Sequence, residues 1–283
     1  MIAPTISAGL PTDRRISVRH AATLPDGMEA VGRVSWRDHD VVGGESLELV
    51  HTFTTADISD DAMVSALVAL VDAGAIHGQW EFEESATGLI QTSSEDPAQA
   101  WAAFYDNSLR ALGDGTAAFA PVHRRARSLI SGSSVLEVGS CFGFLALQCA
   151  DDGLTVSARD ISAGAIALLT AAGRRRRTPV DAAVGDATRL DLADGSVDTV
   201  TLIHLLEHLD DEDVHAAIGE ALRVARRRVV IAIPYEEHPS EHFGHLSTLS
   251  QDNLRSWADA ADHAGAEIFD DHGGWLVLTP HPR

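Results

Sequence analysis

From Phe119 onward, short apolar runs alternate with amphipathic stretches along the chain. The runs have the length of buried strands and lie at residues 135–138, 154–158, 197–203 and 229–233. The stretches have helical spacing and lie at residues 145–150, 163–172, 213–225 and 251–264. Strands that alternate with helices predict a doubly wound α/β fold with a mostly parallel, Rossmann-like sheet. Two further runs, 266–269 and 275–278, predict an antiparallel hairpin at its edge.

The first part of the chain has a different pattern. Residues 1–110 predict a small α+β accessory region, and residues 111–283 the main domain. Between residues 32 and 92, alternating runs such as 46–53 favour short strands. We expect the first dozen residues, which have weak periodicity, to be disordered.

Two helices are predicted in that first part. Residues 60–75 have the spacing of an amphipathic helix. A bridging helix begins at Pro97, where the ring suits the first helical position, and Asp96 is its N-cap. The glycine-containing turn at residues 113–115 predicts its end.

The charge balance narrows the classes of partner. The chain has 42 Asp and Glu against 21 Lys and Arg, a formal net charge of −21, and every one of the 21 is arginine. Affinity for phosphate backbones comes largely from basic side chains, so we expect neither a nucleic acid nor an anionic membrane surface as partner. The absence of lysine excludes Schiff-base and P-loop chemistry.

No segment predicts export or a membrane span. The start of the chain lacks a basic segment followed by an apolar one, and Ser65 and Asp72 interrupt the apolar stretch 62–76. Cys141 and Cys149 are too few for a disulfide framework, so we expect a cytoplasmic protein. A monomer and a homodimer both stay open.

A turn of small residues follows the first strand of the main domain. Val138 is followed by Gly139-Ser-Cys-Phe-Gly143 and then by a helix, so backbone N–H groups can approach a ligand. A dinucleotide fingerprint would need glycine where Cys141 and Phe144 stand, so that interpretation fails. An ordinary strand-to-helix turn and a ligand-binding loop with Glu137 as its acid both stay open at this point.

Acids also follow the next strands. Asp160 ends the second strand, where a carboxylate can accept hydrogen bonds from ribose hydroxyls. Asp186 stands in Val-Gly-Asp-Ala after the third strand and can accept from the exocyclic amine of adenine. The fourth strand leads into Leu-Glu-His-Leu at residues 206–209. Carboxyl ends of parallel strands share one edge of the sheet, so we expect these residues to lie together.

In this order and spacing, the motifs resemble those of the class I S-adenosylmethionine-dependent methyltransferases over about residues 119–283. The resemblance implies an enzyme with S-adenosylmethionine as cofactor. For the methionine part it implies Glu137, Gly139, Ser140, Cys141, Gly143 and the backbone of Ile203 and His204. For the nucleoside it implies Asp160 on the ribose, Ile161 against adenine, and Asp186 with Ala187 at the adenine amine. Cys141 departs from the family, which usually has glycine there, so the resemblance leaves its contact with the cofactor open.

A narrower resemblance is to the mycofactocin-associated oligosaccharide methyltransferases of actinobacteria. It rests on the segments 101–107, 119–123, 136–144, 201–208, 233–237 and 273–277. This family methylates a sugar hydroxyl on a glycosylated, peptide-derived redox cofactor, which implies O-methylation of such a glycan. An O- or N-methyltransferase of another small molecule stays open, as does a degenerate methyltransferase fold used as a binding module.

Methyl transfer to a hydroxyl is helped by a proton acceptor. The candidate bases are His208 and His245, which both follow strands at the ligand-binding edge. The residues expected to shape the acceptor site are Glu207, Tyr235, Glu236 and His238. The alternative for His208 is a structural bond to the loop backbone.

The segment after the fifth strand raises the question of a metal ion. His238, His242 and His245 lie among glutamates at a spacing that can bind a divalent metal. Mg²⁺ prefers oxygen ligands, and these are largely imidazoles. We therefore interpret the segment as a polar acceptor-binding loop and expect no metal.

Overall fold

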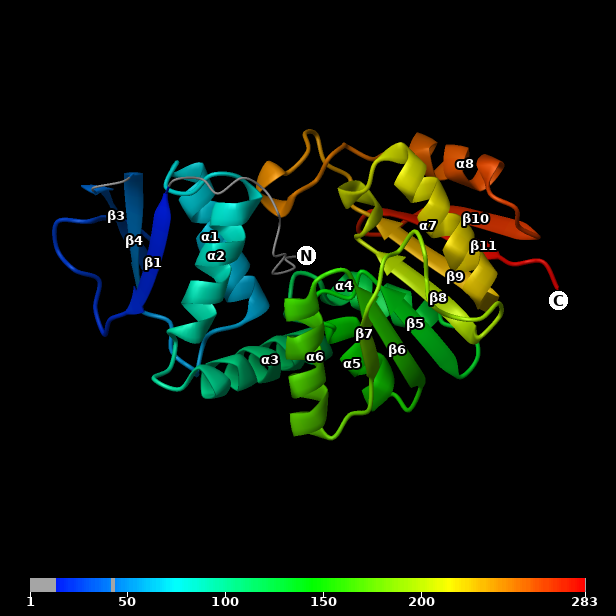
Figure 1. Ribbon diagram of the computed structural model, residues 1–283, viewed down its shortest axis with the longest axis horizontal. Helices are drawn as coiled ribbons and strands as arrows, with labels where there is room; N and C mark the ends of the chain where they lie inside the picture. The colour runs from blue at the N-terminus through cyan, green and yellow to red at the C-terminus, as the bar shows by residue number, and fades with distance from the viewer. Residues whose placement is uncertain (1–13, 42–43, 283) are drawn as a thin grey trace. The chain divides into compact units, whose positions relative to one another are not determined.

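The computed structural model describes residues 14–41 and 44–282, which form two compact units (Figure 1). One unit takes in the described residues up to Ala118, and the other the described residues from Phe119 onward. The predicted boundary after residue 110 falls inside helix α3 (Pro97–Asp114), whose buried face belongs to the first unit, so the division comes after Ala118. The segment expected to be disordered lies outside the described residues.

The first unit is an α+β unit, as predicted. Its four-stranded sheet has the order β1-β4-β3-β2, in which β1 pairs with β4 in parallel and the other pairs are antiparallel. The strands are β1 (Arg15–His20), β2 (Glu29–Val31), β3 (Val34–Val41) and β4 (Gly44–His51). The helices are α1 (Asp60–Asp72), α2 (Gly78–Gln91) and α3.

The two predicted helices of this unit are confirmed, although α1 ends three residues before the predicted bound. The Asp96 carboxylate accepts a hydrogen bond from Ala98 N at 2.9 Å at the start of α3, and Gly115 ends the helix with a φ of 84°. Helix α2 is a correction, because its segment was expected to form strands. Phe82, Ala86, Leu89 and Ile90 recur at helical spacing and are buried, and this burial outweighs the local pattern.

The second unit is a doubly wound α/β unit, as predicted. Its seven-stranded sheet has the order β10-β11-β9-β8-β5-β6-β7. Strands β5 to β9 are parallel, and the hairpin β10–β11 adds antiparallel strands at one edge. The strands are β5 (Ser134–Val138), β6 (Thr155–Asp160), β7 (Asp181–Val184), β8 (Val197–Ile203), β9 (Ala225–Ile233), β10 (Gly265–Asp270) and β11 (Gly274–Thr279). The chain reverses its direction of winding between β5 and β8, which is where such sheets bind ligands.

Helices cover both faces of this sheet (Figure 1). They are α4 (Ala120–Leu129), α5 (Phe144–Asp151), α6 (Ala163–Arg176), α7 (Asp211–Val224) and α8 (Gln251–Ala260). Helices α7 and α8 share one hydrophobic core with the strands, which includes Val200, Leu202, Ile218, Leu254 and Ile231. Helix α8 ends four residues before its predicted bound, at Ala260.

Strand β8 shows how an apolar run in the sequence determines the position of a buried strand. All seven of its residues are buried, which explains why the apolar run predicted its bounds correctly. Thr199 Oγ1 donates to Ser131 O at 2.8 Å, so its hydroxyl is buried with a partner. The next helix, α7, begins after Asp210, whose side chain accepts from Asp213 N at 3.0 Å.

Among the described residues, no helix combines the length and the apolar character needed to span a bilayer. Cys141 and Cys149 are both buried, and they do not form a disulfide with each other.

Candidate active site

Large apolar side chains gather, exposed, at the carboxyl edge of the second unit's sheet. Ile161 follows β6 and is 69% exposed, and Val184 ends β7 and is 56% exposed. Tyr235 and Leu246 lie in the segment after β9. These are the exposed large apolar residues found within the described ranges. Their position at the edge where such sheets bind ligands marks it as the ligand-binding edge.

The turn between β5 and α5 has an unusual backbone. Gly139, Cys141 and Gly143 all have positive φ, at 72°, 50° and 71°. A Cβ on Gly139 would come 2.7 Å from Leu205 Cδ1, so a larger residue would have to displace that side chain and adopt a strained backbone. Cys141 adopts a backbone conformation that glycine takes more easily, and its thiol is buried. The structure thus accommodates the residue that departs from the family pattern.

Two predicted cofactor acids hold this loop in place. The Asp160 carboxylate accepts from Cys141 N at 2.7 Å and from Ser162 N at 2.8 Å. Glu137 accepts from Ala146 N at 2.8 Å in the first turn of α5, and burial raises its pKa to about 8. Both carboxylates therefore stabilise the loop, and their contacts with a cofactor stay a prediction.

The ends of β6 and β7 carry the residues that were predicted to contact the nucleoside. Asp160 and Val184 are paired neighbours across these strands, so Ile161 and Val184 both lie at the ends of adjacent strands, and both are exposed. Asp186 is exposed and accepts from the backbone N and the hydroxyl of Thr188, at 2.8 and 2.7 Å. Two exposed aliphatic side chains and an exposed carboxylate fit an adenine ring and its amine. Sequence analysis missed Val184, although an apolar residue directly before Gly185 was its signal.

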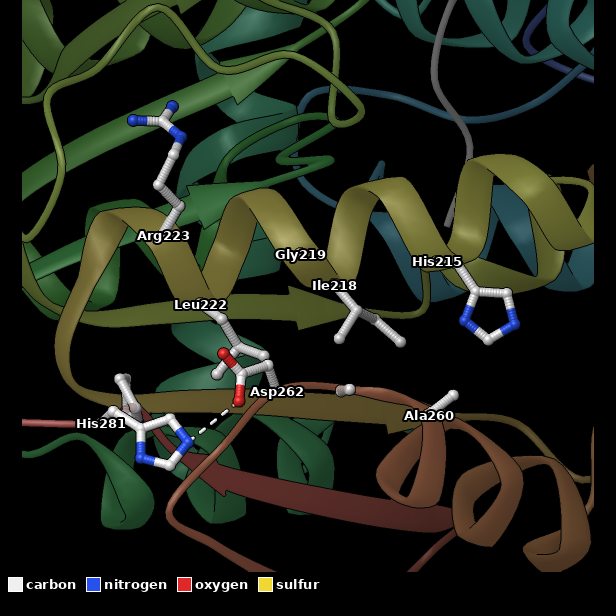
Figure 2. A pocket seen from close by; sticks show the side chains of 10 residues that line it. His215, Ile218, Gly219, Leu222, Arg223, Ala260, Asp262 and His281 are labelled. Carbon is white, nitrogen blue, oxygen red and sulfur yellow. Dashed lines mark hydrogen bonds and ion pairs between the residues drawn. The ribbon is translucent and has the colours of Figure 1, made fainter.

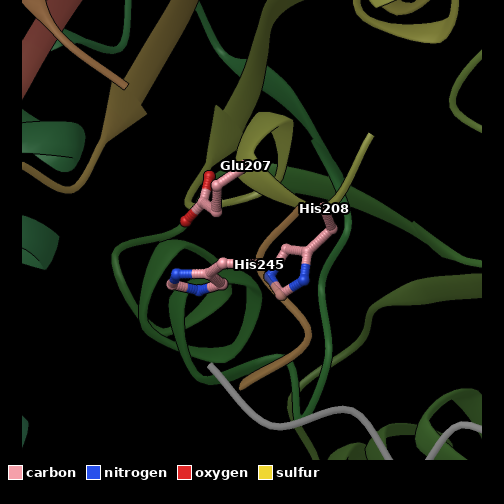
Figure 3. A group of neighbouring side chains, drawn as sticks. All are labelled: Glu207, His208 and His245. Carbon is pink, nitrogen blue, oxygen red and sulfur yellow. The ribbon is translucent and has the colours of Figure 1, made fainter. Parts of the chain in front are cut away.

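The acceptor side holds a group of converging side chains. Glu207 and His208 belong to the 3-10 turn η1 (Leu206–His208) after β8, and His245 lies beyond a second such turn, η2 (Glu241–Phe243). Figure 3 shows the three side chains facing one another. One possible ligand atom from each lies within 4.8 Å of the others, and the two imidazole centroids are 4.9 Å apart. We call this group the Glu207–His208–His245 cluster.

Hydrogen bonds fix the orientation of both imidazoles. His245 Nδ1 lies 2.7 Å from Glu236 Oε2, and His208 Nδ1 lies 3.3 Å from the carbonyl oxygen of Gly244. A carbonyl oxygen can only accept, and a carboxylate accepts when ionised, so both Nδ1 atoms carry the hydrogen. The Nε2 atoms of both rings then carry a free electron pair. The bond from Leu246 N to Glu207 O, at 2.8 Å, holds the two segments together.

Glu207 is the least satisfied member of the cluster. Its side chain is 1% exposed, and neither carboxylate oxygen has a hydrogen-bond partner within the described part of the chain. Burial raises its pKa to about 7. Nδ1 of His204 lies 3.5 Å from Oε1, and the His204 ring packs edge-on against Phe119 at 4.7 Å. The resemblance had assigned only the backbone of His204, whose positive φ of 52° turns the chain here.

The other predicted acceptor residues lie outside the cluster. Tyr235 donates its hydroxyl hydrogen to Asp270 at 2.7 Å and is partly exposed. His238 is exposed. Glu236 acts through His245, to which it is bonded. Of the three histidines after β9, only His245 joins the cluster, and its neighbours there come from the end of β8.

A groove in the second unit lies away from these residues. It has a volume of about 450 Å³ and is lined by α7 and by residues 260–262 and 280–281 (Figure 2). His215, Ile218 and Leu222 of α7 face it, and Asp262 bonds to His281 at 3.0 Å on its rim. Because α7 ends where β9 begins, this groove is at the amino edge of the sheet. It holds none of the predicted site residues.

Comparisons with known proteins agree with this geometry. Residues 136–233 match the family model of a methyltransferase domain. Two curated relatives are named demethylmenaquinone methyltransferase. The one from Renibacterium salmoninarum is 34% identical over 125 residues, which are 44% of this chain and 49% of the relative. The one from Beutenbergia cavernae is 39% identical over 103 residues, which are 36% and 40%. The chain spans about half the length, or less, of these two relatives.

A solved structure shows the same fold. The crystal structure of a protein from Pyrococcus horikoshii superimposes with a TM-score of 0.50 at 15% identity, over 58% of this chain and 89% of that one. Together, the family match over residues 136–233 and the shared fold show a methyltransferase domain in the second unit. S-adenosylmethionine is the cofactor of that domain, and the exposed groups at the ends of β6 and β7 fit its nucleoside.

Proposed function

We propose that the whole chain is an S-adenosylmethionine-dependent O-methyltransferase that acts on a hydroxyl group of a small-molecule acceptor. The observation that supports it most is the Glu207–His208–His245 cluster at the carboxyl edge. The cluster lies beside the glycine turn, because Leu205, which directly precedes η1, is the residue that a Cβ on Gly139 would meet.

The chemistry explains why this cluster is needed. When bound, S-adenosylmethionine supplies a methyl group on a sulfonium, a leaving group that needs no protonation. The protein aligns the acceptor oxygen with the methyl carbon and provides for the hydroxyl proton. We assign that loss of the proton to the cluster, which includes both candidate bases, His208 and His245.

The arrangement favours a hydroxyl over an amine as acceptor. A neutral amine has a free electron pair before it reacts, whereas a hydroxyl is a weak nucleophile until its proton leaves. His245 is held by the Glu236 carboxylate at 2.7 Å. An acid that orients an imidazole in this way is typical of sites that take a proton from a hydroxyl.

For the acceptor we propose a sugar hydroxyl on the oligosaccharide of mycofactocin. The support is the resemblance of the segments around the glycine turn, the end of β8 and the start of β11, together with the net charge of −21, which disfavours phosphate-rich acceptors. A quinone is the second candidate, because the curated relatives are named for demethylmenaquinone. The exposed Tyr235 and Leu246 give it an apolar surface.

The test compares acceptors directly. Purified protein is incubated with S-adenosylmethionine that carries a trideuterated methyl group and, in parallel, with a glucose oligosaccharide, a reduced demethylated quinone and a primary amine. Mass spectrometry locates the label. We expect it on an oligosaccharide hydroxyl, and label only on the amine or on a ring carbon contradicts O-methylation. In calorimetry, absence of binding at millimolar S-adenosylmethionine would instead assign the chain to the degenerate binding modules.

The proposal also covers location and partners. We propose that the protein acts in the cytoplasm, in keeping with two buried cysteines that form no disulfide with each other. The acidic balance supports a role without nucleic acid or membrane partners.

A further inference from the structure

The Glu207–His208–His245 cluster has a property that proton transfer alone does not explain. Glu207 is 1% exposed, and its two carboxylate oxygens lack hydrogen-bond partners among the residues described. A buried ionised carboxylate is costly unless it is paired or coordinates a metal ion. His245 adds a second case, because its side chain is 4% exposed and its Nε2 atom is also unpartnered there.

Both imidazoles are prepared as ligands. His245 Nδ1 is bonded to Glu236, and His208 Nδ1 to the Gly244 carbonyl oxygen. Histidines that bind metals usually donate their other ring N–H to a carboxylate or a backbone carbonyl, and this cluster has one of each. The Nε2 electron pairs of both rings are thereby left for a common ligand.

The spacing suits a single ion. The three possible ligand atoms lie within 4.8 Å of one another. Ligand atoms at about 2.1 Å from one tetrahedral ion lie roughly 3.4 Å apart, so the widest pair needs to close by up to about 1.4 Å. Side-chain torsions supply such a movement without a change in the backbone.

We infer that Glu207, His208 and His245 form a binding site for one divalent transition-metal ion of the Zn²⁺ or Fe²⁺ type. Two imidazole nitrogens and one carboxylate are the ligand set that such ions take when positions are left open for a substrate oxygen. Mg²⁺ fits less well because it prefers oxygen ligands. The inference departs from the expectation of a site without metal, and its ligand set differs from the histidine triplet that the sequence suggested.

This inference rests on the proposed function and deepens it. The acceptor hydroxyl would take an open position on the ion, which lowers the pKa of the hydroxyl. In this scheme the two imidazoles act as metal ligands in place of bases. As the carbon–oxygen bond forms, the O–H bond breaks and the proton passes to solvent water, while the carbon–sulfur bond breaks with its electron pair going to sulfur. Glu236 is a positioning residue in this scheme, because it acts through His245.

The test is metal binding without cofactor or acceptor. Protein without an affinity tag is treated with EDTA, dialysed, and titrated with Co²⁺ and Zn²⁺ by calorimetry and, for Co²⁺, by visible absorption. We expect one ion per chain. Glu207→Gln and His245→Gln should abolish binding, and Glu236→Gln should weaken it about 10- to 100-fold. His215→Gln is the matched control, because His215 is an exposed histidine of α7 outside the cluster.

Thermal melts in EDTA check that each variant folds. Zn²⁺ should raise the midpoint of the wild type and of His215→Gln, but not that of Glu207→Gln or His245→Gln. Equal binding by all variants, no binding by the wild type, or tighter binding of Mg²⁺ than of Zn²⁺ overturns the inference. These results leave methyl transfer untouched. A metal-loaded protein that methylates none of the acceptors contradicts the proposed function instead.

Discussion

Two carboxylates lie near the two ends of strand β8 and differ in their hydrogen-bond partners. Asp198, near its start, accepts from Ser133 N at 2.8 Å and from Ser134 N at 3.2 Å, and it pairs with Arg226 and Arg227. These backbone bonds, with the arginine pairs, hold the pKa of Asp198 well below its ordinary value. Glu207, just after its end, has no such donors within the described ranges, and burial raises its pKa.

The difference suggests that the carboxylate at the start of β8 stabilises the fold, whereas the carboxylate after its end serves function. At the amino edge every oxygen of Asp198 has donors, and Gly132 lies so close that a Cβ there would collide with it. At the carboxyl edge, a carboxylate and an imidazole nitrogen are buried without partners. Folded proteins satisfy nearly all buried polar groups, so unsatisfied ones need an explanation. A ligand that supplies the missing contacts is the explanation we propose.

The strongest test of the functional end is catalytic. His245→Ala or His208→Ala should lower turnover by about 10²- to 10⁴-fold, because the hydroxyl proton is lost at the cluster. Initial rates with saturating S-adenosylmethionine measure the effect. His215→Ala is the control, and full activity in both cluster variants would contradict the assignment.

A substitution of Asp198 should change the stability of the fold. Asp198→Asn should lower the free energy of unfolding by about 2 kcal/mol, because two backbone N–H groups lose a charged acceptor. Chemical denaturation measures it. Asp252→Asn is the matched control, since Asp252 is an exposed acid paired with Arg255, and such pairs contribute at most about 1 kcal/mol. A loss of turnover at room temperature in folded Asp198→Asn would contradict the assignment of Asp198 to stability alone.

The pH dependence of stability tests the same carboxylate. Because the folded pKa of Asp198 is lowered, its stabilisation is fully present above the pKa of the unfolded chain, near 4, and is lost as the pH falls below it. The stability difference between the wild type and Asp198→Asn should therefore shrink as the pH falls from about 5 to 3. Denaturation curves at several pH values would show it, and a constant difference would mean that the charge of Asp198 is unimportant.

Sequence patterns predicted the second unit well because its strands are buried on both faces. The run 197–203 gave the bounds of β8 correctly, and the alternation of elements gave the doubly wound order. Helix α2 was missed because Trp80, Phe82 and Thr87 have side chains that are common in strands. Burial of residues at helical spacing on one face of the segment instead stabilises a helix.

The candidate site was predicted in part. Motifs close in sequence placed Glu207 and His208 after one strand, and His245 after the next. Their convergence on one point depends on the path of the segment after β9, which the bond from Leu246 N to Glu207 O fixes. Hydrophobic periodicity carries no information on such a path. The side chain of His204 was missed for the same reason, although its spacing from Glu207 and His208 was a usable signal.

The smallest expected effect is that of the buried Glu207 carboxylate on stability. In EDTA at pH 8, Glu207→Met should raise the free energy of unfolding by about 1 kcal/mol, because an apolar side chain of similar size replaces a buried, unpartnered charge. The gain should shrink near pH 5, below the pKa of about 7, where the carboxyl group is protonated. Adding Zn²⁺ should reverse the order, since only the wild type then gains binding energy. Denaturation of both proteins under the three conditions measures this, and a less stable Glu207→Met in EDTA would show that Glu207 already has partners in the metal-free protein.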